Sequence, residues 1–351
     1  MRITKTSQGR SALYLAFKAF AKKNKKFIVT QAFTCVAVPE SIIAAGYKPI
    51  WADIELSTFS ISEKSIENIL SNYVNDIGCI LIQHTYGLNP KNYLKIKSLA
   101  SKFEIPIVED RCHCNFLNDY LELVSNKTNK KVVYCYSFEN AKPINLGRGG
   151  LLLTDNESKK ELLNINYNFN YFKKQNVLKS IIHFSIAINY KLFSNSPLYW
   201  PLLHLYRRLA DMGFLPKNFN SIRNKFVLEK IGILQSIFIS FFIFLGNINK
   251  KGLKNKLICK LSDLFTHYFL KRKSNYPIYV DDKKKVLNFC KHNFIYIRNY
   301  FNSPIQPLSE EDYDYFYYKN QLCKFAEEAA AHIVVFDKKP DQSILSKIKS
   351  L

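Results

Sequence analysis

The sequence of 351 residues has little of what marks several special classes of protein. Glycine (11 residues) and proline (12 residues) are too few for a fibrous or low-complexity chain. No apolar run reaches about 18 residues without a polar interruption, so no transmembrane helix is expected. The first ten residues, MRITKTSQGR, lack the apolar stretch of a signal peptide. A hydrophobic content of 47% and a charged content of 23% instead indicate a globular protein, long enough for two domains.

Acidic residues are also scarce, since 28 Asp and Glu stand against 51 Lys and Arg and leave a net charge of +23. Most of the surplus lies in residues 156–300, which contain 25 basic and seven acidic side chains. The basic residues are scattered among Asn, Ile, Phe and Tyr, without zinc-finger spacing or an RNA-binding aromatic motif. We therefore expect a solvated, lysine-rich surface and no nucleic-acid partner.

One stretch of this basic region suggests a second use of the charge. Residues 197–203 are aromatic and aliphatic, and Arg207 and Arg208 follow them. Basic side chains beside exposed aromatic residues are typical of a weak contact with an anionic membrane surface. Packing against the large domain or a second subunit is the alternative, and it is the one we favour.

The eight cysteines contain no C-x-x-C pair, and without a signal peptide they are expected to be free thiols in a reducing cytoplasm. Only Cys112, His113 and Cys114 stand together in the manner of metal ligands. Neighbouring residues of a strand or loop point apart, and no second ligand group is near in the sequence. We therefore expect no metal site.

The first 155 residues alternate short β-branched or aromatic runs with helical patterns. Strands that alternate with helices predict an α/β fold with a mostly parallel sheet covered on both faces. In such sheets ligands bind beyond the carboxyl ends of the strands. The predicted strands are 27–29, 49–52, 77–83, 105–108, 132–138 and 151–154, and the predicted helices are 11–22, 39–45, 62–71 and 94–103.

The remaining residues divide into two regions. Residues 156–270 look mainly helical, and their segment 231–245 is apolar on nearly all sides, which suggests a buried or interface helix. Residues 275–351 return to alternating strands and helices. We expect a large domain over residues 1–250, helical in its part 156–250, and a small α+β domain over residues 251–351.

Polar residues gather where the predicted strands end. Asp110 follows the strand 105–108, Ser137 ends the strand 132–138, and Lys142 comes five residues later. The glycine turn 147–150 precedes the next strand, and the segment 9–11 opens the first helix, where backbone N–H groups form an anion site. Pyridoxal phosphate needs a lysine that binds it covalently, a carboxylate beside its pyridine nitrogen and an anion cradle for its phosphate. This order of residues contains each part.

Longer motifs surround these residues. They are GRSAL at 9–13, QAFTC at 31–35, AGYKPIWADI at 45–54, QHTYG at 83–87, PIVED at 106–110, SFENAK at 137–142, GRGG at 147–150 and CKFAEEA at 323–329. In this order they resemble the DegT/StrS family of pyridoxal-phosphate-dependent sugar aminotransferases, a family of the fold-type-I aminotransferases. The resemblance is good over residues 9–155, thin over 156–270 and moderate over 275–351.

The resemblance implies two catalytic residues. Lys142 would hold the cofactor covalently and later move a proton at the substrate carbon. Asp110 would keep the pyridine nitrogen protonated, because a neighbouring anion favours the charged form.

The resemblance also implies further cofactor contacts. His113 would lie near the phenolic oxygen of pyridoxal 5'-phosphate. The Ser137 hydroxyl and the backbone at Arg10 and Ser11 would bind its phosphate. Two positions depart from the family: Cys35 stands near a position where many members have a stacking aromatic residue, and Arg148 replaces a frequent acidic residue.

A member of this family is expected to be a homodimeric, cytoplasmic enzyme. It would transfer an amino group from an amino-acid donor to a keto-sugar carried on a nucleotide, for glycan or polysaccharide biosynthesis. We expect the donor to be glutamate. Two alternatives stay open. One is a sugar dehydratase of the same family, although that branch has His where Lys142 stands. The other is a non-catalytic descendant that binds a partner or a membrane surface.

Overall fold

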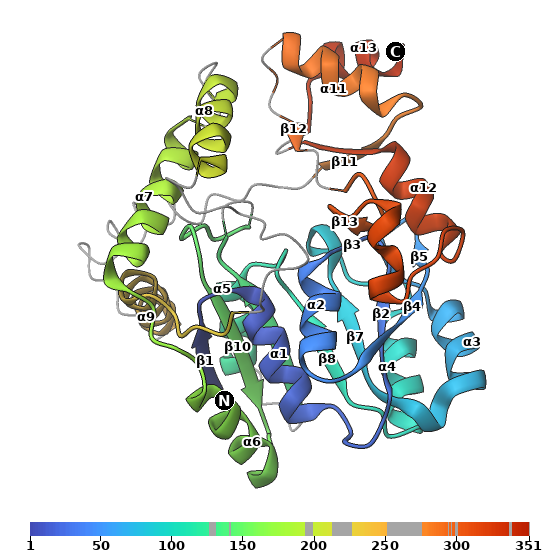
Figure 1. Cartoon of the computed structure of the whole chain (residues 1–351), viewed down its shortest axis with the longest axis vertical. Coiled ribbons are helices and arrows are strands. Elements are labelled where there is room, and N and C mark those ends of the chain that lie inside the picture. Colours follow the sequence, from blue (N-terminus) through green and yellow to red (C-terminus); the bar gives the residue numbers. More distant parts are fainter. Residues whose placement is uncertain are drawn as a thin grey trace.

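The computed structural model describes residues 1–125, 131–139, 142–193, 199–212, 227–250, 276–293, 295, 297–298, 301–336 and 339–350. Its centre is a seven-stranded sheet with the strand order β1-β10-β9-β8-β7-β2-β4 (Figure 1). The five strands from β9 to β4 are parallel, whereas β10 and β1 are antiparallel additions at one edge. The strands are β1 (Arg2–Thr6), β2 (Phe27–Gln31), β4 (Lys48–Ala52), β7 (Ile77–Gln83), β8 (Ile107–Asp110), β9 (Val132–Ser137) and β10 (Gly150–Asp155).

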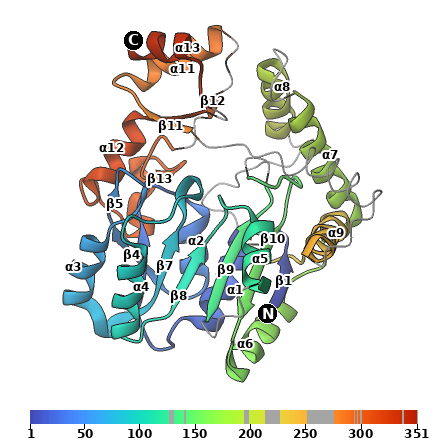
Figure 2. The same cartoon turned by 180° about the vertical axis from the view of Figure 1, so that it is seen from behind.

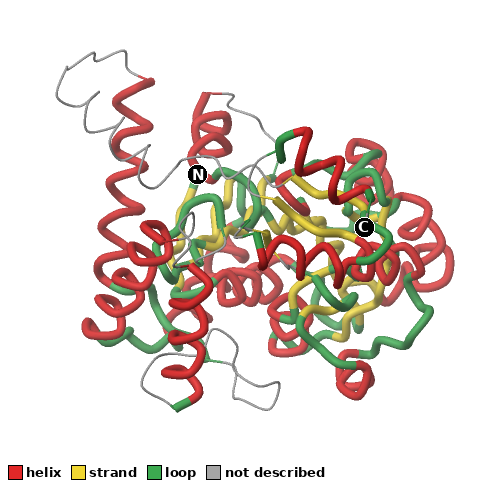
Figure 3. The backbone as a smooth tube through the Cα atoms, turned by 90° about the horizontal axis from the view of Figure 1, so that it is seen from above, coloured by secondary structure: helices red, strands yellow, loops and turns green. Residues whose placement is uncertain are grey.

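Helices cover both faces of this sheet, as the two opposite views in Figures 1 and 2 show. Side chains of α1 and α2 pack on one face, those of α3 and α4 on the other, and α5 covers the other face near β9 and β10. Figure 3 shows the strands enclosed between the helices. The helices are α1 (Gly9–Phe20), α2 (Ala37–Ala44), α3 (Glu63–Tyr73), α4 (Tyr93–Lys102), α5 (Phe116–Ser125) and α6 (Lys159–Asn170), with short 3-10 turns η1 (Val74–Asp76) and η2 (Thr85–Gly87). The predicted mostly parallel α/β sheet is confirmed.

The helical region after β10 forms an arm at the side of the sheet, to the left in Figure 1. It contains α7 (Val177–Phe193), α8 (Tyr199–Asp211) and α9 (Ile233–Lys250). The predicted apolar helix at 231–245 is α9, and it is buried on one side only. Its Ile239 and Phe242 pack in a core with α5, while Ile237 is 57% exposed. No helix of the described residues is long and apolar enough to cross a membrane.

The C-terminal region is a small α+β unit. Its sheet has the order β11-β14-β12, formed by β11 (Tyr276–Tyr279), β14 (Ile333–Phe336) and β12 (Ile297–Arg298). Its helices are α11 (Lys283–His292), α12 (Lys324–His332) and α13 (Gln342–Lys349), with the 3-10 helix η3 (Glu310–Phe316). The domain boundary expected after residue 250 falls at residues 251–275, outside the described part, and stays a prediction.

Two of the longer elements, β1 and α5, were not predicted from the sequence. The edge strand β1 was missed because RITKT alternates weakly and carries two basic residues. Helix α5 was not predicted because the residues shortly before it, Cys112, His113 and Cys114, were considered as metal ligands and not as the turn that precedes a helix. Helix α1 also begins at Gly9 with Gln8 as its N-cap, not at Ser11, which lies inside the first turn.

The C-terminal unit shares an aromatic core with the large sheet domain. Phe33 packs against Phe301 with ring centroids 4.5 Å apart, and the Trp51 indole N–H donates to the Phe316 carbonyl at 2.9 Å. A short parallel ladder adds backbone hydrogen bonds between β3 (Thr34–Cys35) and β13 (Ile305–Gln306). A further two-stranded ladder, β5 (Ile54–Glu55) with β6 (Ser60–Ile61), closes the same side of the core.

Asp53 provides a charged link between the two parts. Its carboxylate accepts hydrogen bonds from the backbone N–H groups of Phe325 (3.0 Å) and Ala326 (2.9 Å), in the first turn of α12. The N-cap residue of α12, Cys323, makes no side-chain capping hydrogen bond, so Asp53 caps this helix from 270 positions earlier in the chain. An anion at a helix N-terminus also interacts favourably with the helix dipole. Asp53, which belongs to the motif at 45–54, thus connects the sheet domain to helix α12 of the C-terminal unit.

We expect Asp53→Ala to lower the free energy of unfolding by about 1–2 kcal/mol, the range for a lost helix cap. Urea unfolding followed by circular dichroism measures the change. The exposed Asp76, whose carboxylate lies 3.3 Å from Lys26 Nζ, provides the control, because Asp76→Ala should change stability by about 0.5 kcal/mol or less. Equal stabilities of the two variants would contradict the capping role.

Candidate functional site

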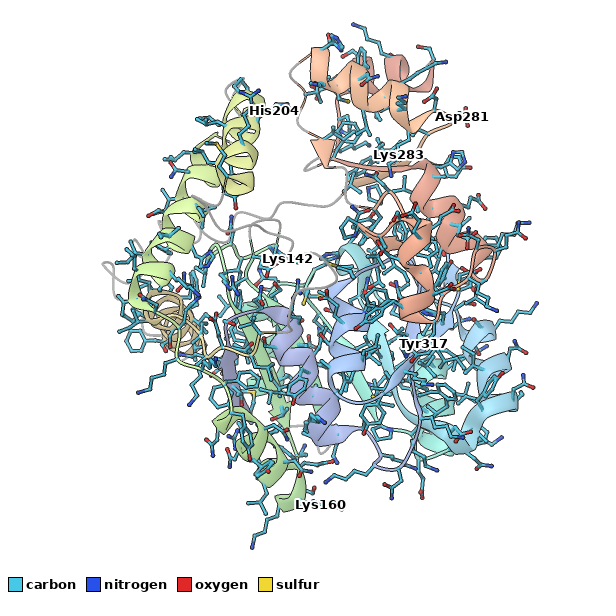
Figure 4. All side chains as sticks on the ribbon, viewed as in Figure 1. Lys142, Lys160, His204, Asp281, Lys283 and Tyr317 are labelled. Atoms are coloured by element: carbon cyan, nitrogen blue, oxygen red, sulfur yellow. The ribbon has the colours of Figure 1, made fainter. Side chains whose placement is uncertain are left out.

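A pocket of about 250 Å³ lies at the carboxyl ends of the central strands. Its walls come from the ends of β7, β8 and β9, the start of α1, the glycine turn before β10 and helix α7, with Phe301 and Gln306 from the C-terminal unit. Figure 4 places Lys142 above the sheet in the middle of the molecule. Of the six residues predicted to contact a cofactor, five line this pocket: Arg10, Asp110, His113, Ser137 and Lys142.

Asp110 is the last residue of β8 and is 6% exposed. Its backbone lies between Gln83 of β7 and Cys135 of β9, so three strands fix its position. One carboxylate oxygen, Oδ1, accepts a hydrogen bond from the Cys112 N–H at 3.0 Å. This contact holds the carboxylate at the wall of the pocket.

Glu109, the residue before it, is buried on the opposite side of the strand and anchors that side. Its carboxylate lies 2.8 Å from His84 Nε2, 2.6 Å from the Tyr93 hydroxyl, 3.1 Å from Arg111 Nη1 and 3.4 Å from Lys97 Nζ. Burial alone would raise the pKa of Glu109, but the hydrogen bond and charge of His84, with Lys97 and Arg111, lower it to about 2. The carboxylate is therefore charged at neutral pH.

The network extends from Arg111 to α5. The Arg111 guanidinium donates to both oxygens of Asp119, at 2.8 and 3.0 Å, and the Tyr136 hydroxyl donates to the same carboxylate at 2.8 Å. These contacts connect β8, β9 and α5 beneath the pocket. The sequence analysis assigned Glu109 no role beyond its place in the motif at 106–110, because its partners come from three separate segments.

The phosphate end predicted for the pocket combines Ser137 with the start of α1. The first N–H groups of a helix have no partner inside it, and the N-cap Gln8 makes no side-chain capping hydrogen bond. A Cβ at Gly9 would lie 2.9 Å from the Cβ and 3.3 Å from the Oγ of Ser137. Only glycine therefore allows the helix end to approach the serine this closely.

Arg10 and Ser11 occupy different environments in this turn. The Arg10 guanidinium forms an ion pair with Glu40 of α2 at 2.5 Å. The structure does not bring Ser11 to the pocket wall: its N–H donates to the Gln8 carbonyl at 3.2 Å. Its hydroxyl is buried without a hydrogen-bond partner among the described residues. The predicted backbone contact of Ser11 with a phosphate stays a prediction, since Ser11 lies inside the first turn of the helix and not on the described pocket wall.

His113 lies in the turn after β8, with its ring parallel to Tyr86 at 6.1 Å between centroids. Its Nδ1 accepts from the Tyr86 N–H at 3.1 Å, which fixes the orientation of the ring. No group of three or more His, Cys, Asp and Glu side chains suited to a metal ion occurs within the described ranges.

Several residues of the pocket were not predicted as part of the site. Gln83 and His84 end β7 and stood inside a recognised motif, so their position was a usable signal. Phe301 and His183 had no signal, since they come from distant segments with no motif. Phe301 is the only Phe, Tyr or Trp among the described residues of the wall, where Cys35 offers no stacking ring. Lys283 holds the Phe301 backbone by donating to its carbonyl at 2.5 Å, and burial lowers the pKa of this lysine to about 8.

These residues fit pyridoxal phosphate. The wall offers an amine at Lys142, a nearly buried carboxylate at Asp110 and, where α1 meets Ser137, hydroxyl and backbone donors beside a helix N-terminus. The donor set therefore matches a cofactor with an aldehyde, a basic ring nitrogen and a phosphate.

Comparisons with known proteins agree with this donor set. A model of the DegT/DnrJ/EryC1/StrS aminotransferase family matches residues 3–196, more than half of the chain. A UDP-4-amino-4,6-dideoxy-N-acetyl-beta-L-altrosamine transaminase from Campylobacter jejuni is 32% identical over 152 residues, which are 42% of this chain and 38% of that protein. A UDP-2-acetamido-2-deoxy-3-oxo-D-glucuronate aminotransferase from Pseudomonas aeruginosa is 27% identical over 152 residues, 43% of this chain and 40% of that protein. The chain therefore matches about two fifths of the length of these curated relatives.

Solved structures match over a longer span. DesV from S. venezuelae superposes with a TM-score of 0.60 at 11% identity, covering 99% of this chain and 82% of that chain. PseC from Helicobacter pylori gives a TM-score of 0.56 at 18% identity, covering 100% and 88%. At such identities the likeness shows the fold, which is that of the fold-type-I aminotransferases. With this fold and with the matched residues surrounding the pocket, the chain belongs to the DegT/DnrJ/EryC1/StrS aminotransferase family.

Proposed function

We propose that this protein is a pyridoxal-phosphate-dependent aminotransferase that moves an amino group from an amino acid, with glutamate as the donor, to the keto group of a nucleotide-linked sugar. The observation that supports it most is the meeting of Lys142, Asp110 and Ser137 in one pocket at the start of α1. Several relatives are named as transaminases of UDP-linked or dTDP-linked sugars. An amino-sugar product suits glycan or polysaccharide biosynthesis in the cytoplasm.

Bound pyridoxal phosphate would supply an electron sink for the transfer of the amino group. Lys142 would anchor it and move the proton at the reacting carbon. Asp110 would hold a proton on the ring nitrogen, since an adjacent anion favours the charged form. Ser137 and the start of α1 would bind the phosphate, because helix N-termini favour anions. Lys142 also disfavours the dehydratase alternative, in which His stands at this position.

We predict that Lys142 is the lysine that holds the cofactor. Borohydride reduction of the protein saturated with pyridoxal phosphate, followed by peptide mass mapping, should place a pyridoxyl group on Lys142. The Lys142→Ala variant should lose both the label and the visible absorption, whereas Lys179→Gln, on an exposed side chain of α7, should keep them. A pyridoxyl group on another lysine would contradict this assignment.

Asp110 should matter for chemistry more than for folding. Asp110→Ala should slow the absorbance change that L-glutamate produces in the pyridoxal phosphate form by about 100- to 1000-fold, as expected for a lost preorganised charge. Asp110→Glu should retain part of the rate. Asp110→Ala with a near wild-type rate and a bound cofactor would show that the ring nitrogen is held by another group.

We further propose that the protein is a homodimer. Helix α9 exposes Ile233, Ile237 and Phe244, which are spaced by four and seven residues and so form one apolar stripe. Helix α7, which packs beside α9, exposes Val177, Leu178, Ile181, Ile188 and Leu192. Apolar stripes of this kind are typical of surfaces that a partner covers.

Light scattering after size exclusion should give twice the chain mass of 40.9 kDa, and Ile237→Asp should shift the protein to one chain. Leu94→Asp, on the exposed α4 surface, should stay dimeric. A wild-type monomer that sediments with anionic but not neutral vesicles, and less so at high salt, would instead favour the weak membrane contact. A wild-type monomer that stays in the supernatant with every type of vesicle would contradict both the homodimer and the membrane contact.

A further inference from the structure

The end of the pocket beyond Lys142 is built by the glycine turn and α7. Arg148 lies on this turn, six residues after Lys142, and both residues line the pocket with His183 of α7. Gly147 has a φ of +76°, and a Cβ there would lie 1.7 Å from the His183 carbonyl oxygen. The turn and the helix are therefore in direct contact, which fixes where the Arg148 side chain begins.

The Arg148 guanidinium has only a long ion pair, to Glu229, among the residues that the structure describes. Its Nη1 lies 3.4 Å from His183 Nε2 and its Nη2 lies 3.7 Å from the Glu229 carboxylate. Its Nε is buried and has no hydrogen-bond partner within the described part of the chain. Arg111, by contrast, donates to both oxygens of Asp119 at 2.8 and 3.0 Å. Arg148 thus keeps hydrogen-bonding capacity that Arg111 has used.

The surroundings of Arg148 do not neutralise it fully. Burial and the positive charges of Arg148 and Lys179 lower the pKa of His183 to about 4, so this imidazole is neutral and can offer Arg148 only the lone pair of Nε2. Glu229 lies between two cations, Arg148 at 3.7 Å and Lys179 at 3.6 Å. Burial likewise lowers the pKa of Arg148, which indicates a cation whose lost hydration is not replaced.

We propose that Arg148 binds a carboxylate of the substrate, as a specificity residue of the proposed transamination on which this inference rests. The planar fork of a guanidinium matches the two oxygens of a carboxylate. With Glu229 and the pocket residue Glu139 nearby, a singly charged group suits the balance of charge better than a doubly charged phosphate. The carboxylate belongs either to the amino-acid donor or to an acidic sugar.

Calorimetric titration of the pyridoxal phosphate form distinguishes these sources. UDP-glucuronate and UDP-glucose differ by a carboxylate against a hydroxymethyl group, and 2-oxoglutarate and 2-oxopentanoate differ by the distal carboxylate. None of the four has an amino group, so the titration records binding alone. One charged probe should bind the wild type about tenfold or more tightly than its neutral match, the size expected of a charge-assisted pair; if Arg148 binds the carboxylate that both oxo acids share, both should instead bind the wild type about tenfold or more tightly than Arg148→Gln.

Arg148→Gln should abolish that preference, and Arg148→Lys should restore part of it. Loss of the preference in the nucleotide pair identifies an acidic sugar, and loss in the oxo-acid pair identifies the donor. Equal weakening of both oxo acids identifies the carboxylate that they share. Lys179→Gln removes one positive charge beside the same Glu229, from a side chain that is 61% exposed, and should preserve the preference.

The inference is overturned if Arg148→Gln binds all four probes as the wild type does, with cofactor absorption and melting temperature unchanged. It is overturned equally if Lys179→Gln loses the preference as Arg148→Gln does, since the effect would then be one of net charge. Failure of the proposed function has a separate signature, because the wild type itself would then carry no pyridoxyl label on Lys142.

Discussion

The buried charge of Glu109 is the constraint on which the site depends. An ionised carboxylate inside a protein requires several donors, and here they come from the end of β7, from α4 and from the turn before α5. Successive side chains of a strand point to opposite faces, so fixing Glu109 below the sheet edge directs Asp110 toward the pocket. The hydrogen bonds of one carboxylate thereby determine where the next one lies.

The two ends of the pocket can bind anions by different means. Near α1, glycine at position 9 lets a helix end approach Ser137, which creates a place for an anion at a helix N-terminus. Beyond Lys142, the anion-binding capacity comes from a guanidinium on a turn that α7 holds in place. The first end consists of residues in motifs that resemble the family, whereas Arg148 departs from its motif and His183 stands outside the motifs. The proposed substrate end is therefore where this chain departs from the motifs.

The sequence predicts the parts that depend on local pattern. The parallel strands were expected because each is a short β-branched run between helical patterns, and the rule that ligands bind at strand ends placed Asp110, Ser137 and Lys142 together. The contacts of Glu109, the role of Asp53 and the presence of His183 could not be predicted, because each depends on segments far apart in the chain. The start of α1 shows the limit of local reasoning as well: the helix begins two residues before the expected Ser11, so Ser11 lies inside its first turn.

The shared aromatic core has a consequence for how the chain folds. The hydrogen-bond partners of Trp51 and Asp53 are Phe316 and the first turn of α12, which are synthesised late. The last strand of the large sheet, by contrast, ends at residue 155. A nascent chain therefore exposes Phe33, Trp51 and the open edge of β3 until some 300 residues have been made. Such a surface promotes aggregation, and domains generally fold in the order of synthesis. The C-terminal unit thus covers apolar surface of the sheet domain that is exposed until the unit has been made. Truncation near the C-terminus would expose this surface again and lower the solubility of the protein.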